Sequence, residues 1–434
     1  MDFTDSPYRK PTPPQGTTVQ QNRIAFLESS LSGTGNEAIR TAKRLGHHVT
    51  LITRDLDYYR QAGRGFDEAL IDQVIICDTD DAETVASAVT RHGGADALLT
   101  MSEWHVVVTA QAAARLRLVG ADPDAVRAAR DKSRTRALCS ASGVPIPAYH
   151  RLTNAVLPPA FPLPCVIKPV DGALSSGVKL CRTGEEARQH TQALLDQCAE
   201  PNERGQRRTP AVLIEEYLVG PEFSVETLTY QGRTHVVAIT QKLLSPPPLF
   251  FETGHVVPAA LPEPTWQACA DLVRAALAAI GYEFGAAHVE LRVTAAGPKL
   301  IEINCRPAGD LITHLATLAS GVDLVAELID MHLGRAPRLT PDRSDAAAIV
   351  FLPSREGVVD RIEGMSQALA GPGVSTVSLY VGEGAELAAT GSNSDRLGHV
   401  IAVGPDPEVA LGRAQAAAGQ VQVSYREVEV SAAV

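Results

Sequence analysis

Polar side chains alternate with apolar ones along residues 298–307. The polar positions supply a carboxylate, an amide and a guanidinium, from Glu302, Asn304 and Arg306. Because successive side chains of a strand point to opposite faces, we expect these three to share a face with Leu300, while Ile301 and Ile303 pack on the other face. A face of this composition could bind phosphate through a metal ion.

A second strand of alternating polarity precedes the first, at residues 287–293, with His288, Glu290 and Arg292 as its polar positions. Residues 294–297 form a predicted hairpin turn, so antiparallel pairing would bring Glu290 and Glu302 to one ligand. Adjacent carboxylates repel each other unless a cation lies between them, and Mg²⁺ prefers such oxygen ligands. One strand of this kind would be better explained as a solvated hairpin, but two neighbouring strands favour a metal site.

Basic residues upstream suit the phosphates of a nucleotide. A short apolar strand at 164–169 ends in Lys168, and the glycine- and serine-rich loop at 171–178 can bring backbone amides close to an anion. This loop lacks the Gly-Lys-Ser/Thr ending of a Walker loop. Lys132 lies in a predicted helix at 124–141, where it would on its own be a solvated helix lysine.

The order of these parts resembles the ATP-grasp superfamily. The matching parts are an Asp-Lys helix, a Val-Ile-Lys-Pro strand with a glycine-rich loop, a Glu-Glu-Tyr-Leu hinge, and His-x-Glu and Glu-x-Asn-x-Arg strands. The resemblance spans about residues 20–430. It is strongest to carboxylate-amine ligases that include bacterial L-amino acid (dipeptide) ligases, because of the runs at 304–310 and 250–258.

The resemblance implies ATP and Mg²⁺ as cofactors, with two ions and with Mn²⁺ as a substitute. The residues implied to bind ATP are Lys132, Lys168, Ser175, Ser176, Gly177, Glu215, Tyr217, Leu218, Glu222 and Glu226. Adenine would lie at the hinge formed by Glu215, Tyr217 and Leu218, and the ribose at Glu222 or Glu226. The implied metal ligands are Glu290, Glu302 and Asn304. The implied substrate contacts are Glu252, His255, Arg306, Gly309 and Asp310, and the implied catalytic residues are Arg306, Lys168, Glu302 and His255.

The implied reaction joins a carboxylate to an amine. The carboxylate attacks the γ-phosphate of ATP to give an acyl phosphate and ADP, and the amine then displaces phosphate. Arg306 would hold the anionic oxygen of the tetrahedral intermediate. No pattern identifies the base for the amine: His255 and Glu252 are candidates, although Glu252 could bind an ammonium group and both could belong to a surface loop. Asp310 leads us to expect a substrate with a polar or cationic side chain.

Composition narrows the class of protein. The chain has 434 residues, of which 45% are hydrophobic, so several domains are expected. A net charge of -11 argues against nucleic-acid and membrane partners, and leaves small-molecule carboxylates and amines, amino acids among them. Seven scattered cysteines suit a reduced, cytoplasmic protein, and Cys305 is interpreted as a packing residue. No signal sequence or membrane-spanning run is visible.

The predicted fold is multidomain, combining α/β and α+β parts. Residues 1–21 form a polar, disordered tail, and 22–125 a Rossmann-like domain of parallel strands and crossover helices. Gly33 and Gly35 lack the third glycine of a dinucleotide site, so this domain is expected to be a scaffold, with 102–105 as a candidate substrate contact. The remaining expected divisions are an ATP-grasp subdomain at 126–210 with a mobile loop at 200–208, a second at 211–334, and a β-rich subdomain at 335–434.

Two alternative functions share part of this pattern. An ATP-grasp ligase acting on bicarbonate or another non-amino-acid carboxylate, such as a biotin carboxylase, would have the same phosphate and metal residues. However, no Met-Lys-Met carrier sequence is present. A nucleotide-binding regulator without catalysis would be expected to lack Glu290, Glu302 or Arg306, and all three are present. A homodimer is expected only by analogy with the family.

Overall fold

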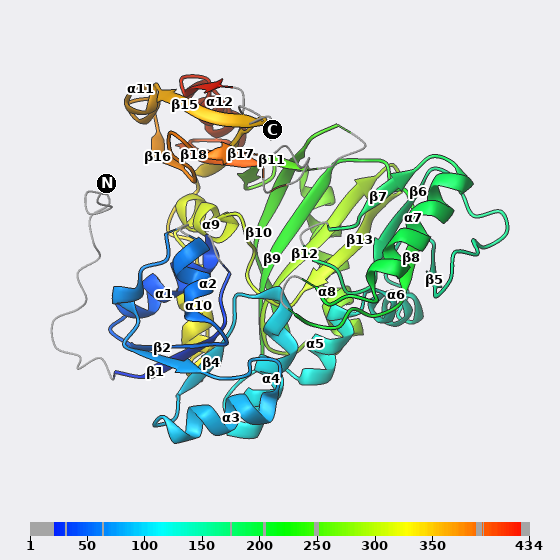
Figure 1. The fold of residues 1–434 in the computed structure, drawn as a ribbon, viewed down its shortest axis with the longest axis horizontal. Coiled ribbons are helices and arrows are strands. Elements are labelled where there is room, and N and C mark those ends of the chain that lie inside the picture. The colour runs from blue at the N-terminus through cyan, green and yellow to red at the C-terminus, as the bar shows by residue number, and fades with distance from the viewer. Residues whose placement is uncertain are drawn as a thin grey trace, which may run out of the picture.

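The computed structural model describes residues 21–426, except 31–32, 63–64, 174–175, 203–204, 247–250, 388–392 and 394. The tail predicted at 1–21 therefore lies almost wholly outside the described residues. A large sheet lies in the middle of the molecule (Figure 1). Around it lie an N-terminal α/β domain, a smaller α+β unit and a C-terminal unit.

The N-terminal domain is built on a parallel sheet of order β3-β2-β1-β4. Its strands are β1 (Arg23–Leu27), β2 (His48–Thr53), β3 (Gln73–Ile76) and β4 (Ala97–Leu99). Its helices are α1 (Thr34–Arg44), α2 (Leu56–Ala62), α3 (Ala82–Arg91) and α4 (Val106–Leu116), with 3₁₀ turns at Glu68–Leu70 and Glu103–His105. The strands are mostly apolar because both faces are covered, one by α3 and α4 and the other by α1 and a later helix, α10.

The helix predicted at 124–141 is two helices, α5 (Pro123–Arg130) and α6 (Lys132–Ala141). Asp131 separates them in an extended conformation, and its carboxylate accepts hydrogen bonds from the backbone N–H groups of Ser133 and Arg134. An aspartate that satisfies free N–H groups in this way begins a new helix. This break places Lys132 at the first position of α6.

The region at 126–210, expected to be the first subdomain, contains an antiparallel sheet of order β5-β8-β6-β7. Its elements are β5 (Tyr149–Leu152), β6 (Cys165–Pro169), β7 (Lys179–Cys181), α7 (Gly184–Gln197) and β8 (Val212–Glu216). The described part of the loop predicted to be mobile is tied down, since Gln206 Nε2 donates to Asp80 Oδ1 at 2.6 Å and to the Trp104 carbonyl at 3.4 Å. The loop therefore connects this subdomain to the N-terminal domain.

The central sheet has eight strands in the order β13-β12-β9-β10-β11-β14-β18-β16, all neighbours antiparallel. Its first part consists of β9 (Glu222–Tyr230), β10 (Arg233–Leu244), β11 (Glu252–Val257), β12 (Gly285–Thr294) and β13 (Gly297–Asn304). The accompanying helices are α8 (Glu263–Ala279), α9 (Ile312–Ser320) and α10 (Leu324–His332). Helices α5 and α8 bury one face of β9, β12 and β13, which fixes the opposite face as the functional one.

The hairpin predicted around 294–297 is present, and it pairs Glu290 directly with Glu302. The strict alternation predicted for its second strand is wrong, because the register shifts after this pair and Leu291 lies opposite Leu300. Ile301 is the extra residue of a β-bulge. Leu300 therefore packs in the core beside Ile303 and does not share the face of Glu302.

The C-terminal unit continues the central sheet. Its elements are β14 (Ala346–Pro353), β15 (Gly357–Glu363), α11 (Met365–Leu369), β16 (Val374–Leu379), β17 (Glu386–Leu387), β18 (Arg396–Gly404), α12 (Pro407–Ala418) and β19 (Gln422–Arg426). Strand β14 pairs with β11, so the predicted division near residue 334 runs through one sheet. Strands β17, β15 and β19 form a separate small sheet.

Among the described residues, no single helix has the length and apolar character needed to cross a membrane. Helices α9 and α10 would meet those criteria only as a pair, bent by 103° at their junction.

Candidate active site

The two carboxylates predicted to bind metal each face a lysine. Glu290 and Glu302 are direct cross-strand partners on β12 and β13. Lys132 Nζ lies 2.9 Å from Glu302 Oε1, and Lys242 Nζ lies 2.8 Å from Glu290 Oε1. Asn304 joins them: in the amide orientation that satisfies both of its polar atoms, its nitrogen donates to Glu302 Oε1 at 3.3 Å. The structure thus brings the predicted metal residues together beside one predicted phosphate lysine.

The second predicted phosphate lysine, Lys168, belongs to a buried ionic triad. Its Nζ lies 2.7 Å from Glu215 Oε2, and the other oxygen of Glu215 accepts from Arg136 Nε at 2.8 Å. Burial lowers the pKa of Lys168, and although burial alone would raise the pKa of Glu215, the two cations hold it below its usual value. Arg136 also donates to the carbonyl of the bulged residue Ile301. The carboxylate predicted to lie at the adenine is therefore already engaged in holding Lys168.

The glycine-rich loop reaches the site through its backbone. Lys132 Nζ donates to the Gly172 carbonyl at 2.8 Å, which ties the loop to the metal residues. Gly177 has a φ of 75°, and a Cβ there would come within 2.8 Å of Leu194, so the turn requires glycine. Ser176 closes the turn by donating its backbone N–H to Ala173. Ser175 lies outside the described residues.

The predicted hinge follows β8. The Leu218 carbonyl accepts from Arg292 Nη1 at 2.8 Å, and the Arg292 guanidinium lies over the Tyr217 ring, 5.5 Å from its centre. Glu222 binds Arg292 Nε at 3.1 Å and Lys242 Nζ at 3.0 Å. Arg292, on the metal hairpin, thus fixes the hinge relative to the metal residues.

Glu226 does not fit the position predicted for a ribose ligand. It is 1% exposed, on the central strand β9, and both of its carboxylate oxygens lie 3.0 Å from His288 Nδ1. Burial alone would lower the pKa of His288, but the charges of Glu226 and Glu290 raise it to about 10. His288 is therefore a cation at neutral pH and engages Glu226. Of the two residues predicted at the ribose, only Glu222 remains at the hinge.

Sequence reasoning missed Lys242, which lies at the centre of three carboxylates. Its side chain is 4% exposed, and its Nζ contacts Glu222, Glu252 and Glu290 at 3.0, 2.9 and 2.8 Å. Although burial alone would lower the pKa of Lys242, the three carboxylates raise it well above its usual value. The available signal was weak: one lysine near the end of a strand, β10, that also contains Arg233 and several uncharged polar residues.

The predicted substrate residues gather at the end of β11. His255 Nε2 and Arg396 Nη1 lie 3.3 and 2.9 Å from Asp310 Oδ2, and Arg396 also binds Glu252 at 3.2 Å. The guanidinium of Arg396 lies over the Phe351 ring, 3.5 Å from its centre. Asp310 therefore offers no uncompensated carboxylate, contrary to the reasoning that predicted a cationic substrate side chain from this residue alone. Arg396, from the C-terminal unit, is a second residue that sequence reasoning missed.

The turn that carries Asp310 has a strained backbone and is open at Gly309. Asp310 and Leu311 have φ values of 52° and 60°, in the left-handed region that residues other than glycine rarely adopt. Gly309 is exposed, with open space where a side chain would begin. Glu252, His255 and Asp310 each place a ligand atom within 4.8 Å of the others, close enough to share a metal ion. However, Lys242 and Arg396 already supply positive charge there.

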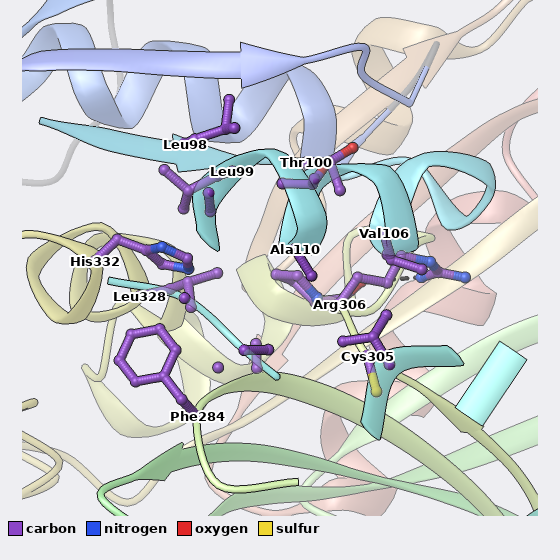
Figure 2. A pocket seen from close by; sticks show the side chains of 18 of the residues that line it. Leu98, Leu99, Thr100, Val106, Ala110, Phe284, Cys305, Arg306, Leu328 and His332 are labelled. Carbon is purple, nitrogen blue, oxygen red and sulfur yellow. Dashed lines mark hydrogen bonds between the residues drawn. The ribbon is translucent and has the colours of Figure 1, made fainter. Parts of the chain in front are cut away.

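Arg306 is held by the N-terminal domain. Its Nε lies 2.7 Å from Glu103 Oε2, and the other oxygen of Glu103 accepts from Arg130 Nη1 at 3.0 Å. Residues 102–105, predicted as a candidate substrate contact, thus bind the residue predicted to hold the acyl group. Behind Arg306, Cys305 lines a cavity of about 50 Å³ between the N-terminal domain and α10, with apolar neighbours such as Leu328 (Figure 2).

Comparison with family models identifies three domains in this chain. Residues 161–314 match an ATP-grasp domain, residues 39–119 an ATP-grasp N-terminal domain, and residues 349–426 the L-amino acid ligase C-terminal domain 2. The ATP-grasp fold expected from the sequence is confirmed.

Curated relatives include ligases. The chain is 28% identical to alanine–anticapsin ligase of Bacillus subtilis, over 71% of this chain and 69% of that protein. It is 32% identical to carnosine synthase 1 of Gallus gallus over 64% of this chain, a match that spans about a third (32%) of that longer protein. An uncharacterized protein of Sinorhizobium fredii is 29% identical, over 90% of this chain and 81% of that protein. Among solved structures, an L-amino acid ligase from Bacillus licheniformis superimposes with a TM-score of 0.79 at 22% identity, covering 94% of this chain and 99% of that one.

Proposed function

Since this chain belongs to the ATP-grasp superfamily and is a ligase related to L-amino acid ligases and carnosine synthase, we propose that it joins two amino acids, or an amino acid and a related compound, through an acyl phosphate. ATP would be converted to ADP and phosphate. The observation that carries the proposal is the convergence of Lys132, Glu290 and Glu302 with Arg306, which Glu103 holds from a different domain.

The residues present fit ATP and a divalent cation. Glu290, Glu302 and Asn304 offer the hard oxygen ligands that Mg²⁺ prefers, and they are adjacent on one sheet face. Positive charge already lies beside both carboxylates, since Lys132 Nζ is 2.9 Å from Glu302 and Lys242 Nζ is 2.8 Å from Glu290. A bound ion would neutralise charge on the transferring phosphoryl group. Freed from Glu302, Lys132 would be available to the phosphates.

The chain's own residues would act mainly by positioning and by neutralising charge, which is what phosphoryl transfer requires. Lys168 would contact the nucleotide phosphates while Glu215 and Arg136 hold it in place. Arg306, oriented by Glu103, would bind the oxygen that becomes negative when the amine attacks the acyl phosphate.

The substrate end has charges suited to an amino acid. Glu252 is the candidate for binding an ammonium group, which would have to replace Lys242 or Arg396 as its partner, now at 2.9 and 3.2 Å. His255 is the other candidate for the base that takes the amine proton: if its Nε2–H donates to Asp310 Oδ2, at 3.3 Å, the buried Nδ1 would be the nitrogen that accepts the proton. Cytoplasmic location remains part of this proposal, and the seven free cysteines support it.

The test is nucleotide product analysis with ATP, Mg²⁺ and pooled amino acids, with mass spectrometry of the products. Amino-acid-dependent ADP and phosphate, together with a mass equal to two amino acids less water, would support the proposal. ADP formed only with bicarbonate or with other carboxylates would favour the alternative ligase, and AMP with pyrophosphate would contradict an acyl phosphate. Hydroxylamine added in place of the amine should trap the acyl phosphate as a hydroxamate.

A further inference from the structure

One arginine contacts both the phosphate side and the metal side of the proposed site. Arg136, on helix α6, is fully buried, and its Nε donates to Glu215 Oε1 at 2.8 Å. The other carboxylate oxygen of Glu215 binds Lys168 Nζ at 2.7 Å. In the opposite direction, Arg136 Nη2 donates to the carbonyl of Ile301 at 2.5 Å. Ile301 is the bulged residue directly before Glu302, the predicted metal ligand.

Helix α6 therefore holds two consecutive residues of β13. Lys132 and Arg136 are four residues apart on α6, so their side chains share a face of the helix. Lys132 Nζ lies 2.9 Å from the carboxylate of Glu302, while Arg136 binds the backbone at Ile301. Because a β-bulge changes the direction of neighbouring side chains, the contact at Ile301 bears on where Glu302 points.

Stability alone does not explain a charged residue at this position. Arg136 Nη1 is buried and has no hydrogen-bond partner among the residues that the structure describes. A buried donor without a partner is unfavourable, and apolar side chains of similar volume often stabilise a protein as well as a buried ion pair does. Electrostatics gives Arg136 a use, since it occupies one oxygen of Glu215. The group of Arg136, Glu215 and Lys168 then has two cations and one carboxylate, so Lys168 keeps charge for a phosphate.

We propose that Arg136 is a positioning residue for both halves of the nucleotide site: it orients Lys168 through Glu215, and it orients Glu302 through the bulge at Ile301. Nucleotide phosphate at Lys168 and a divalent cation at Glu302 then both depend on one buried side chain. This inference rests on the use of ATP and Mg²⁺ in the proposed function.

The test measures binding of the β,γ-imido analogue of ATP, which is not hydrolysed, by titration calorimetry. The Kd is determined in EDTA and in saturating Mg²⁺, and the ratio of the two values is the gain in affinity due to the metal. In Arg136→Met the Kd in EDTA should rise about tenfold and the metal gain should fall about tenfold. Tenfold is the lower end of the range for a lost hydrogen bond to a charged group. Arg134→Met, exposed on the same helix, is the matched control and should bind as wild type does.

Double variants show whether Arg136 acts through the two residues named. In a Lys168→Met background, Arg136→Met should leave the Kd in EDTA unchanged and still lower the metal gain. In a Glu302→Gln background, which already lacks the metal gain, Arg136→Met should raise only the Kd in EDTA. Arg136→Lys covers the case in which Arg136→Met does not fold. A lysine keeps the charge that pairs with Glu215 but lacks the planar fork, so it should keep the affinity in EDTA and lose metal gain.

Two results would overturn the inference. One is a Kd in EDTA and a metal gain that both stay within about twofold of wild type in Arg136→Met. The other is an equal loss of affinity from Arg136→Met with and without Lys168→Met, because Arg136 would then not act through Lys168. A wild type that binds the analogue but joins no amino acids would overturn the proposed reaction and leave this inference standing. A wild type that binds no nucleotide would overturn both.

Discussion

Replacing Lys242 with methionine should destabilise the protein far more than the loss of an exposed ion pair. Methionine has a similar length but no charge, and it would leave Glu222, Glu252 and Glu290 facing one another where the ammonium now lies within 3.0 Å of each. Removing one partner from a buried ionic cluster typically costs about 3–5 kcal/mol, and we expect the lower end of that range here because Arg292, Arg396 and His288 still compensate one carboxylate each.

Thermal melts followed by circular dichroism at neutral pH, without divalent ions, would measure this loss. Lys43→Met is the matched control, since Lys43 pairs at 2.8 Å with a half-exposed carboxylate, that of Asp72. Exposed pairs contribute about 0–1 kcal/mol, so the control should shift the melting temperature little. Equal shifts for Lys242→Met and Lys43→Met would refute the view that Lys242 holds the three carboxylates together.

The same variant allows a second measurement. Mg²⁺ should restore part of the lost stability of Lys242→Met, because an ion that binds only the native state stabilises it. The wild type, in which Lys242 already compensates Glu290, should gain less. An equal gain in both proteins would contradict the proposal that lysine and metal neutralise the same carboxylates.

Four further predictions concern the reaction, the pH dependence of stability and the substrate preference. Glu302→Gln should reduce ADP formation to background, whereas Arg306→Ala should slow amide formation about 10²- to 10³-fold; near-normal product from either would contradict its assigned role. The stability due to His288 is fully present below its unfolded pKa of 6.5 and is lost as pH rises through its folded pKa of about 10, so wild type should lose more melting temperature over that range than His288→Asn. Arg396→Gln should expose the charge of Asp310 and shift substrate preference about tenfold toward amino acids with cationic side chains, measured by competition between Arg, Leu and Met; an unchanged preference would show that Asp310 does not face the substrate side chain.

Much of the site was predictable because strand alternation is a local property. The polarity of residues 287–293 and 298–307, with a turn between them, was enough to predict that antiparallel pairing brings Glu290 and Glu302 to the same ligand, and the structure places the two residues directly opposite each other. The bulge at Ile301 was not predictable, because its carbonyl is held by Arg136, which is far away in the sequence.

The residues that sequence reasoning missed have partners in distant segments. Lys242 and Arg396 belong to no motif in their own strands, and their importance appears only when β10 and β18 take their places in one sheet. Glu103 was noted for its position after a strand, but its pairing with Arg306 depends on how two domains meet. The break at Asp131 was readable in principle, since aspartate is a favoured residue at the start of a helix.

The pairing of β14 with β11 has a consequence for synthesis of the protein. The predicted phosphate and metal residues have all emerged from the ribosome once Asn304 has emerged. The edge of β11, however, is covered only when residues 347–350 have emerged as well. Arg396 follows later still. The nascent chain therefore carries an open strand edge beside an incomplete substrate pocket, so ligase activity should arise only after Arg396 has emerged from the ribosome.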